Sequence, residues 1–240
     1  MRVLLGSGGF RTPERIALLS QTMKSHFGTI RKLLFVPYAL KDHDQYVQTL
    51  LQRGLDAGYE IQPLHLQPDP VKAVWNAEGI FVGGGNTFRL LKTLYDLQLI
   101  DVIRTKVKGG LPYLGVSAGC NIACPSIKTT NDMPIVEPPT LQALGLVPFQ
   151  VNPHYVQGAM SYQDTAGNYH AHFGETRDDR LREFHEENAT PVIGLWEGGI
   201  LDCDGRHVKL IGTPARVFKR GEAPVDVAAG EELSSYLSGL

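Results

Sequence analysis

The chain has 240 residues, of which 42% are hydrophobic and 20% are charged, and its formal net charge is −2. This composition is typical of a globular protein that can bury one sizeable core. The near-neutral charge, with no run of five like charges, argues against a nucleic-acid or anionic-membrane partner. No apolar run reaches the roughly 18 residues of a transmembrane helix, and no secretory signal is recognised.

The cysteine content indicates a reducing compartment. Three cysteines are present, Cys120, Cys124 and Cys203, an odd number without metal-ligand spacing. We therefore expect a cytoplasmic protein without a disulfide framework. No motif implies a metal or another cofactor.

The first 125 residues alternate short apolar runs with longer amphipathic ones. The short runs predict strands at Val3–Leu5, Lys32–Val36, Glu60–Leu64, Gly79–Val82 and Pro112–Val116. The longer runs predict helices near Pro13–Lys24, Asp42–Ala57, Pro70–Ala77, Asn86–Leu97 and Leu99–Lys108. This alternation predicts an α/β fold, in which a layered, mostly parallel sheet carries helices on both faces.

The second half is less regular. Its patterns predict a helix over Arg177–Glu187, opened by Thr176 with Asp179 three residues on. They predict strands at Val147–Val151, Val192–Leu195, Gly199–Asp202, His207–Ile211 and Arg216–Lys219, the later ones pairing as hairpins around Asp204-Gly205. Since neither a linker nor an internal repeat is visible, we expect a single domain over residues 1–240.

A candidate nucleophile follows the fifth predicted strand. Gly115-Val116-Ser117-Ala118-Gly119 matches the Gly-x-Ser-x-Gly elbow, in which a sharp strand-to-helix turn exposes a serine hydroxyl. A Cβ at either glycine would collide with neighbouring backbone. A serine hydroxyl is a weak nucleophile unless a base lies beside it, so the chain must also supply one.

A triple glycine, Gly83-Gly84-Gly85, ends the preceding strand. Functional groups of parallel sheets gather at the carboxyl ends of the strands, so this loop and Ser117 are expected to share one crevice. A phosphate-binding loop is the alternative for the triple glycine. The segment lacks both the Gly-Lys-Ser/Thr ending and the Gly-x-Gly-x-x-Gly spacing of such loops.

Two residues are candidates for the base and its acid. His154 follows a predicted strand and the turn-forming pair Asn152-Pro153, although its position alone fits an ordinary loop histidine equally well. Glu197 follows a strand and precedes two glycines, so it also lies at a strand end. The order serine, histidine, acid differs from the α/β-hydrolase fold, in which the acid precedes the histidine.

The other histidines after Ser117 fit structural roles better. His185 lies in a polar helix and is expected to be exposed, while His207 belongs to a predicted hairpin. His170 and His172 lie in a stretch that is typical of a loop. No carboxylate or cysteine is spaced to complete a metal site with them.

Four segments together give a more specific interpretation. FVGGGNTFRLL, PYLGVSAGCNIA, TTNDMPIVEP with LGLVPFQVNPHY, and GETRDDRLRE with VIGLWEG resemble peptidase E, the aspartyl dipeptidase family of serine peptidases. The similarity runs from about Ile80 to Glu197. It implies a flavodoxin-like fold of the class I glutamine amidotransferase type, hydrolysis of dipeptides with N-terminal aspartate, and a Ser117–His154–Glu197 triad.

Further roles follow from this chemistry and the resemblance. Backbone N–H groups of Ala118 and of Gly85 or Gly84 are candidates for the oxyanion hole. The substrate's aspartyl carboxylate calls for a guanidinium, for which Arg177 is the candidate. The resemblance places Asp132 near the substrate, where it is a candidate for the α-ammonium group. A helix-start arginine and a turn-capping aspartate are the structural alternatives.

Several expectations remain open at this stage. A cyanophycinase-like hydrolase of aspartyl–arginine polymer and a catalytically inactive binding protein are the alternative functions. Glutamine amidotransfer would need a cysteine at the elbow, where this chain has Ser117.

Cys120 is interpreted as a packed thiol. The long segment 155–173 is expected to be a mobile flap that closes on a small dipeptide substrate. A homodimer is compatible with the sequence.

Overall fold

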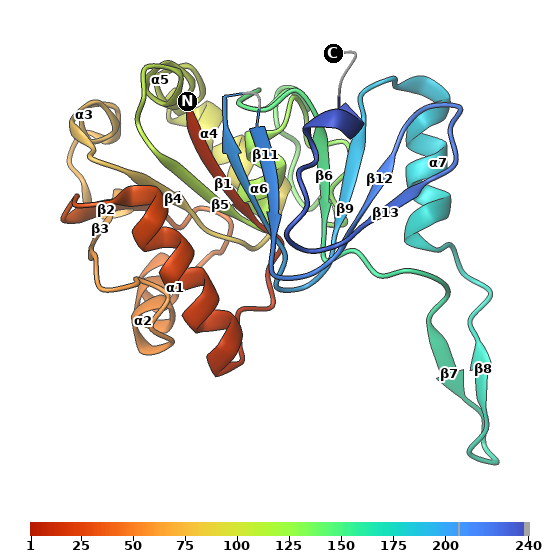
Figure 1. Cartoon of the computed structure of the whole chain (residues 1–240). Coiled ribbons are helices and arrows are strands. Elements are labelled where there is room, and N and C mark those ends of the chain that lie inside the picture. Colours follow the sequence, from red (N-terminus) through yellow and green to blue (C-terminus); the bar gives the residue numbers. More distant parts are fainter. Residues whose placement is uncertain (206, 238–240) are drawn as a thin grey trace.

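A seven-stranded mixed sheet forms the centre of the computed structural model, which describes residues 1–205 and 207–237 (Figure 1). Its strand order is β11-β10-β1-β5-β4-β2-β3. The strands are β1 (Arg2–Gly6), β2 (Lys32–Val36), β3 (Glu60–Pro63), β4 (Ile80–Val82), β5 (Tyr113–Val116), β10 (Ile200–Asp204) and β11 (His207–Ile211). Strands β1 to β5 are parallel to one another, whereas β10 pairs antiparallel with β1 and β11 pairs antiparallel with β10.

Helices cover both faces of this sheet. They are α1 (Pro13–Phe27), α2 (His43–Gln52), α3 (Pro70–Asn76), α4 (Thr87–Asp96), α5 (Leu99–Lys108) and α6 (Ala118–Ala123), with a 3-10 turn at Leu64–Leu66. Alternate strand residues face opposite sides. Leu4 of β1 packs with Leu19 of α1, whereas its neighbours Val3 and Leu5 belong to the core beneath α4 and α5. The predicted α/β class, a mostly parallel sheet with helices on both faces, is confirmed.

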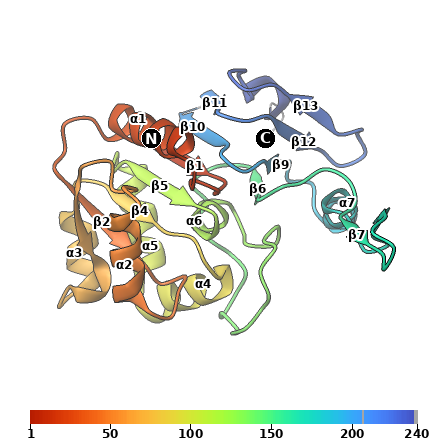
Figure 2. The same cartoon turned by 90° about the horizontal axis from the view of Figure 1, so that it is seen from below.

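A second sheet lies beside the first. Its order is β13-β12-β9-β6, with β6 (Gln150–Pro153), β9 (Val192–Leu195), β12 (Ala215–Phe218) and β13 (Val225–Val227). The short helix α6 packs against β6, and one buried cluster includes residues of both sheets, among them Leu5 and Ile193. Figure 2 shows α6 at this junction. Helix α7 (Arg177–Glu187) begins with the predicted capping box of Thr176 and Asp179, and a 3-10 turn covers Ser234–Leu237.

Some predicted boundaries are wrong for local reasons. The second helix ends at Gln52, short of the predicted Ala57, because Gly54 has a φ of 64° that a helix cannot continue through. The strand predicted at Val147–Val151 lies instead at Gln150–Pro153, where it pairs in register with β9. Strand β13 was not predicted. None of the described helices is long and apolar enough to cross a bilayer.

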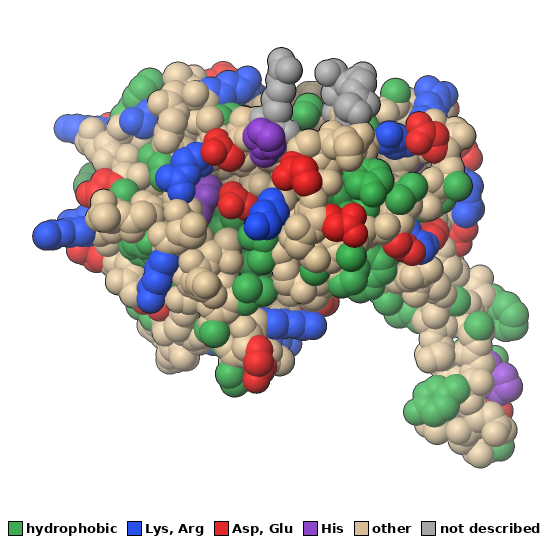
Figure 3. Space-filling model, in the orientation of Figure 1, with side chains coloured by type: hydrophobic (Ala, Val, Ile, Leu, Met, Phe, Trp, Pro, Cys, Tyr) green, Lys and Arg blue, Asp and Glu red, His purple; other side chains and the backbone are tan. Residues whose placement is uncertain are grey.

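The segment that follows His154 was predicted to contain a loop around His170 and His172, but it forms a hairpin. Strands β7 (Ser161–Gln163) and β8 (Tyr169–Ala171) pair antiparallel, with His170 inside β8. Asp164 closes the turn by accepting hydrogen bonds from the N–H groups of Ala166 and Asn168, both at 2.9 Å. The hairpin extends away from the body of the molecule (Figures 1 and 3), so it does not cover the sheet edge in this conformation.

His185 also differs from its expectation. Its side chain is buried, not exposed, because the polar helix α7 turns this position towards the body. The ring nitrogen Nδ1 lies 3.1 Å from the carbonyl oxygen of Asn188. The charged neighbours of His185 in the sequence therefore did not indicate that its side chain is buried.

Candidate active site

Ser117 lies at a sharp turn between β5 and α6. Its φ of 56° and ψ of −109° are unusual for a residue with a side chain. A Cβ on Gly115 would come within 2.3 Å of the carbonyl oxygen of Gly119, and a Cβ on Gly119 within 2.3 Å of that of Val82. The two glycines are therefore required by the close approach of backbone on both sides of the turn, as the sequence predicted.

The side chains of Ser117, His154 and Glu197 form one hydrogen-bonded chain. Ser117 Oγ lies 2.7 Å from Nε2 of His154, and Nδ1 of His154 lies 2.6 Å from Oε1 of Glu197. The His154 side chain is 40% exposed, so a small molecule can reach it from solvent. This arrangement can deprotonate the serine hydroxyl and stabilise the imidazolium that results.

The second sheet explains why His154 and Glu197 meet. Strands β6 and β9 are parallel neighbours, and Pro153 is opposite Leu195 in the ladder. His154 follows Pro153 directly and adopts a φ of 56°, while Glu197 lies two residues beyond Leu195. Because parallel strands end at the same edge, the two side chains are brought together there and face the end of β5.

Two of the three predicted oxyanion donors have free N–H groups. The amides of Gly85 and Ala118 donate to no described residue. Gly84 also lies beside the nucleophile, because a Cβ on it would be 3.0 Å from Cβ of Ser117. Its amide, however, interacts with the hydroxyl of Tyr46, whose pKa burial raises to about 12. Gly85 and Ala118 therefore fit the oxyanion role better than Gly84.

The loop after β1 was not among the candidates that the sequence predicted. Ser7 Oγ accepts a hydrogen bond from the His154 N–H and donates one to the carbonyl of Leu195, both at 2.8 Å. A Cβ on Gly8 would lie 2.4 Å from Cε1 of His154, and a Cβ on Gly9 would lie 1.9 Å from Oε2 of Glu197. The signal was Ser-Gly-Gly directly after the first strand, at the same sheet edge as the other glycine-rich loop.

Asp132 is held at the start of α4. Its Oδ2 atom accepts hydrogen bonds from the N–H and the hydroxyl of Thr87, at 2.8 and 2.6 Å, and from the hydroxyl of Thr130 at 3.1 Å. Thr87 in turn lies 3.4 Å from the side-chain amide of Asn121, one helical turn after Ser117. The structure does not bring Asp132 into contact with the triad, but it connects them through Thr87 and Asn121.

Arg177 lies at the first position of α7 and is partly buried. It makes no hydrogen bond or ion pair with any described residue. Burial, together with the charge of Arg180, lowers its pKa, although a guanidinium remains charged near neutral pH. A partly buried cation without an anionic partner is typical of a ligand site. Arg177 does not contact Ser117, His154 or Glu197.

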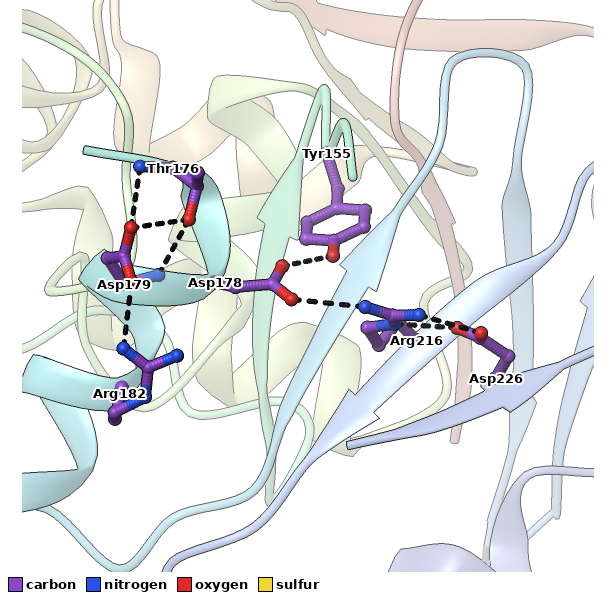
Figure 4. A network of polar contacts seen from close by, with 7 residues as sticks. All are labelled: Tyr155, Thr176, Asp178, Asp179, Arg182, Arg216 and Asp226. Carbon is purple, nitrogen blue, oxygen red and sulfur yellow. Dashed lines mark hydrogen bonds and ion pairs between the residues drawn. The ribbon is translucent and has the colours of Figure 1, made fainter. Parts of the chain in front are cut away.

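A polar network joins the start of α7 to the end of β6 (Figure 4). Tyr155, the residue after His154, donates to Asp178, and Asp178 accepts from Arg216 at 3.0 Å. Arg216 also binds Asp226 through two hydrogen bonds of 2.6 and 2.7 Å. The turn that carries Arg177 is thus connected to the residue next to His154.

The thiols and the remaining histidines do not add chemistry to this site. Cys120 is fully buried, which raises the pKa of its thiol well above the usual range, and its sulfur lies 3.1 Å from the carbonyl oxygen of Gly6. It is the packed thiol that was expected. Among residues 1–205 and 207–237, no group of three His, Cys, Asp or Glu side chains is placed to hold a metal ion.

Comparisons with known proteins agree on one family. A family model described as peptidase family S51 matches residues 3–211. Peptidase E of Streptomyces coelicolor is 50% identical over 86% of this chain and 82% of its own length. A probable alpha-aspartyl dipeptidase of Drosophila melanogaster is 45% identical over 87% of this chain and 84% of its own. The crystal structure of a peptidase from an acI-B1 Actinobacterium shares the fold, with a TM-score of 0.66 and 18% identity over 96% of this chain and 95% of that one.

Proposed function

Since the chain belongs to peptidase family S51, we propose that it is a serine dipeptidase that hydrolyses dipeptides with N-terminal aspartate. The proposal rests on the hydrogen-bonded chain from Ser117 through His154 to Glu197, beside the amides of Gly85 and Ala118, which donate to none of the described residues. The names of the Streptomyces and Drosophila relatives support the substrate class.

In the first half of the reaction Ser117 Oγ attacks the peptide carbonyl carbon. His154 Nε2 takes the hydroxyl proton, and Glu197 stabilises the imidazolium through its hydrogen bond to Nδ1. The carbonyl oxygen becomes an oxyanion that accepts hydrogen bonds from the amides of Gly85 and Ala118. Losing one such donor typically raises the barrier by about 3 kcal/mol.

In the second half the intermediate collapses and the C–N bond breaks. His154 delivers its proton to the departing amine, which leaves the aspartyl group as an ester on Ser117. Water then attacks the ester while His154 accepts a proton from it. Collapse of this second intermediate returns the proton to Ser117 and releases aspartate.

Substrate recognition requires groups of both signs. The free guanidinium of Arg177 matches the aspartyl side-chain carboxylate, for which a planar fork of donors is well suited. Asp132 is the candidate partner of the substrate's α-ammonium group, because only its Oδ2 atom is engaged by Thr87 and Thr130. The remaining oxygen leaves acceptor capacity for a ligand.

The decisive assay compares Asp-Leu, Glu-Leu, Asn-Leu and Ala-Leu with the wild type and Ser117→Ala. We expect aspartate to be released from Asp-Leu alone and the activity to be lost in the variant. Retained turnover by Ser117→Ala, or equal use of Ala-Leu, would contradict the proposal. Cyanophycin is included as a fifth substrate, since the extended hairpin leaves the sheet edge uncovered and therefore open to a polymer.

Charge recognition is tested separately. Arg177→Met is expected to raise KM for Asp-Leu more than tenfold, because a desolvated pair with a carboxylate is lost. The control is Arg180→Met, which removes a half-exposed charge one turn along the same helix. Asp132→Asn is expected to raise KM with a smaller effect on kcat. An unchanged KM in Arg177→Met would assign the aspartyl carboxylate to another cation.

The proposal includes a cytoplasmic location and a homodimer. Cys120, Cys124 and Cys203 are buried free thiols, which supports a reducing compartment. The exposed hydrophobic side chains of the segment 155–173, among them Tyr169 and Phe173, offer a surface for self-association. Analytical ultracentrifugation of the full chain, with Phe173→Glu as the variant, tests the oligomeric state.

A further inference from the structure

Glu197 uses only one of its two carboxylate oxygens for His154. Oε1 receives the 2.6 Å hydrogen bond from Nδ1. Oε2 is shielded from solvent and has no hydrogen-bond partner among the described residues. An unpaired buried carboxylate oxygen is unfavourable unless a positive charge lies nearby. The charged groups near Oε2 therefore bear on how the Glu197 carboxylate is held.

The guanidinium of Arg15, on α1, lies near this oxygen but forms no hydrogen bond with it. A Cβ built on Gly9 would be 1.9 Å from Glu197 Oε2 and 3.1 Å from Arg15 Nη1. Both atoms therefore lie close to the position that this Cβ would occupy. Arg15 is held there by a 3.2 Å hydrogen bond from Nη1 to the carbonyl of Gly9. On the other side, a Cβ on Gly198 would be 2.8 Å from Arg15 Nε.

We propose that Arg15 is a positioning residue for the triad, which keeps the Glu197 carboxylate ionised and directed at His154. The inference rests on the catalytic function proposed above for Ser117, His154 and Glu197. A carboxylate orients the imidazole and stabilises the imidazolium, whereas a protonated carboxyl group would do neither. A fixed cation beside the free oxygen favours the ionised form.

Two glycines make this arrangement sterically possible. Gly9 and Gly198 have φ values of 69° and 84°, in the left-handed region that favours glycine. The Gly198 N–H donates to the carbonyl of Gly8 at 2.8 Å, so the loop after β1 and the loop after Glu197 are joined. Side chains at Gly9 or Gly198 would fill the space that Arg15 and the carboxylate occupy.

The charges around Glu197 come from two elements. His154 approaches from the end of β6 and forms the hydrogen bond to Oε1, while Arg15 approaches from α1. Among the described residues, only His154 forms an ion pair with Glu197, and Arg15 lies near Oε2 without pairing with it directly. A fixed positive charge near this hydrogen-bonded pair opposes the uptake of a further proton. Removing Arg15 should therefore make the pair accept a proton at higher pH.

The test is the rate at which a fluorophosphonate modifies Ser117, measured from pH 4 to 9 in the full-length protein. This reaction needs the triad but no aspartyl recognition. In Arg15→Met we expect the acid midpoint to rise by about 0.5 pH unit or more and the rate below that midpoint to fall about threefold or more. Arg15→Lys keeps the charge and should retain the wild-type midpoint. Arg11→Met removes an exposed charge from the same loop and should leave both quantities unchanged.

The outcomes separate the two proposals. If the wild type is not modified at Ser117, the proposed function falls and this inference falls with it. If the wild type reacts and Arg15→Met has the same acid midpoint, Arg15 has a merely structural role even where the rate is lower. An equal shift in Arg11→Met would show a general charge effect and would also overturn the inference. A shift confined to Arg15→Met, reversed in Arg15→Lys, supports it.

Discussion

Tyr155 donates a hydrogen bond to Asp178 and thereby ties the residue after His154 to the first turn of α7 (Figure 4). Burial, and next the adjoining carboxylate, raise the pKa of Tyr155, so its hydroxyl remains a donor at neutral pH. The Arg216 guanidinium, itself only 12% exposed, binds the other oxygen of Asp178. The end of β6, the start of α7 and strand β12 are therefore linked through charged side chains that are largely withdrawn from solvent.

Replacing Arg216 should destabilise this region. Arg216→Met leaves Asp178 without its cation, and breaking a buried pair typically costs about 3–5 kcal/mol, with the partial exposure of Asp226 placing this case near the lower limit. The matched control is Arg182→Met. Arg182 pairs with Asp179 on the same helix but is 71% exposed, so its loss should cost less than about 1 kcal/mol. Urea unfolding of both variants provides the comparison, and equal losses would contradict a special role for Arg216.

A methyl group at Gly8 should disable the site without unfolding the protein. Gly8→Ala would place Cβ 2.4 Å from Cε1 of His154 and so displace the imidazole from Ser117. A displacement of about 1 Å typically costs a hundredfold in rate, which we expect in kcat/KM. Gly58→Ala is the control, since Gly58 also has a positive φ, of 88°, but open space around it. Both variants should lose about 1–3 kcal/mol of stability through backbone strain, and only Gly8→Ala should lose activity.

The stability of the fold should fall below neutral pH because of His26. This side chain is 3% exposed, and burial, followed by the charge of Arg2, lowers its pKa to about 4. Above about pH 6.5 the histidine is neutral in both the folded and the unfolded chain. Between pH 6.5 and 4 only the unfolded chain takes up the proton, so the free energy of unfolding decreases by roughly 3 kcal/mol over that range.

The variant His26→Gln should remove most of this pH dependence. Urea unfolding at pH 7, 5.5 and 4.5 measures it, and the exposed His172→Gln is the control that should retain the wild-type slope. A wild-type slope in His26→Gln would assign the acid sensitivity to other groups.

The β7–β8 hairpin should be dispensable for folding but not for substrate binding. Its hydrogen bonds, such as those of Asp164, are internal, so replacing residues 161–171 by two glycines should leave the melting temperature nearly unchanged. If the hairpin closes on the substrate as a flap, KM for Asp-Leu should rise several-fold because a closing loop excludes water. Steady-state kinetics decide this, and unchanged KM and kcat would eliminate the flap.

The elbow and the strand-end placement of His154 and Glu197 were predictable from sequence. Each has a local signal: Gly115 and Gly119 flank the serine, and an apolar run precedes each of the other two residues. The α/β class was predictable for the same reason, since periodicity along the chain reports which residues face a core. The structure places the three side chains within hydrogen-bonding distance; their catalytic roles are the subject of the proposal.

The rest depended on contacts between distant parts of the chain. Ser7 binds the backbone of His154, 147 residues away, and Arg15 and Glu197 both lie close to Gly9. No local sequence pattern predicts contacts of this kind. The burial of His185 was likewise decided by what α7 packs against. Local sequence sets turns, caps and periodicity because these depend on backbone preferences within a few residues. Which loops meet at the sheet edge is decided by strand order and packing, which only the folded chain defines.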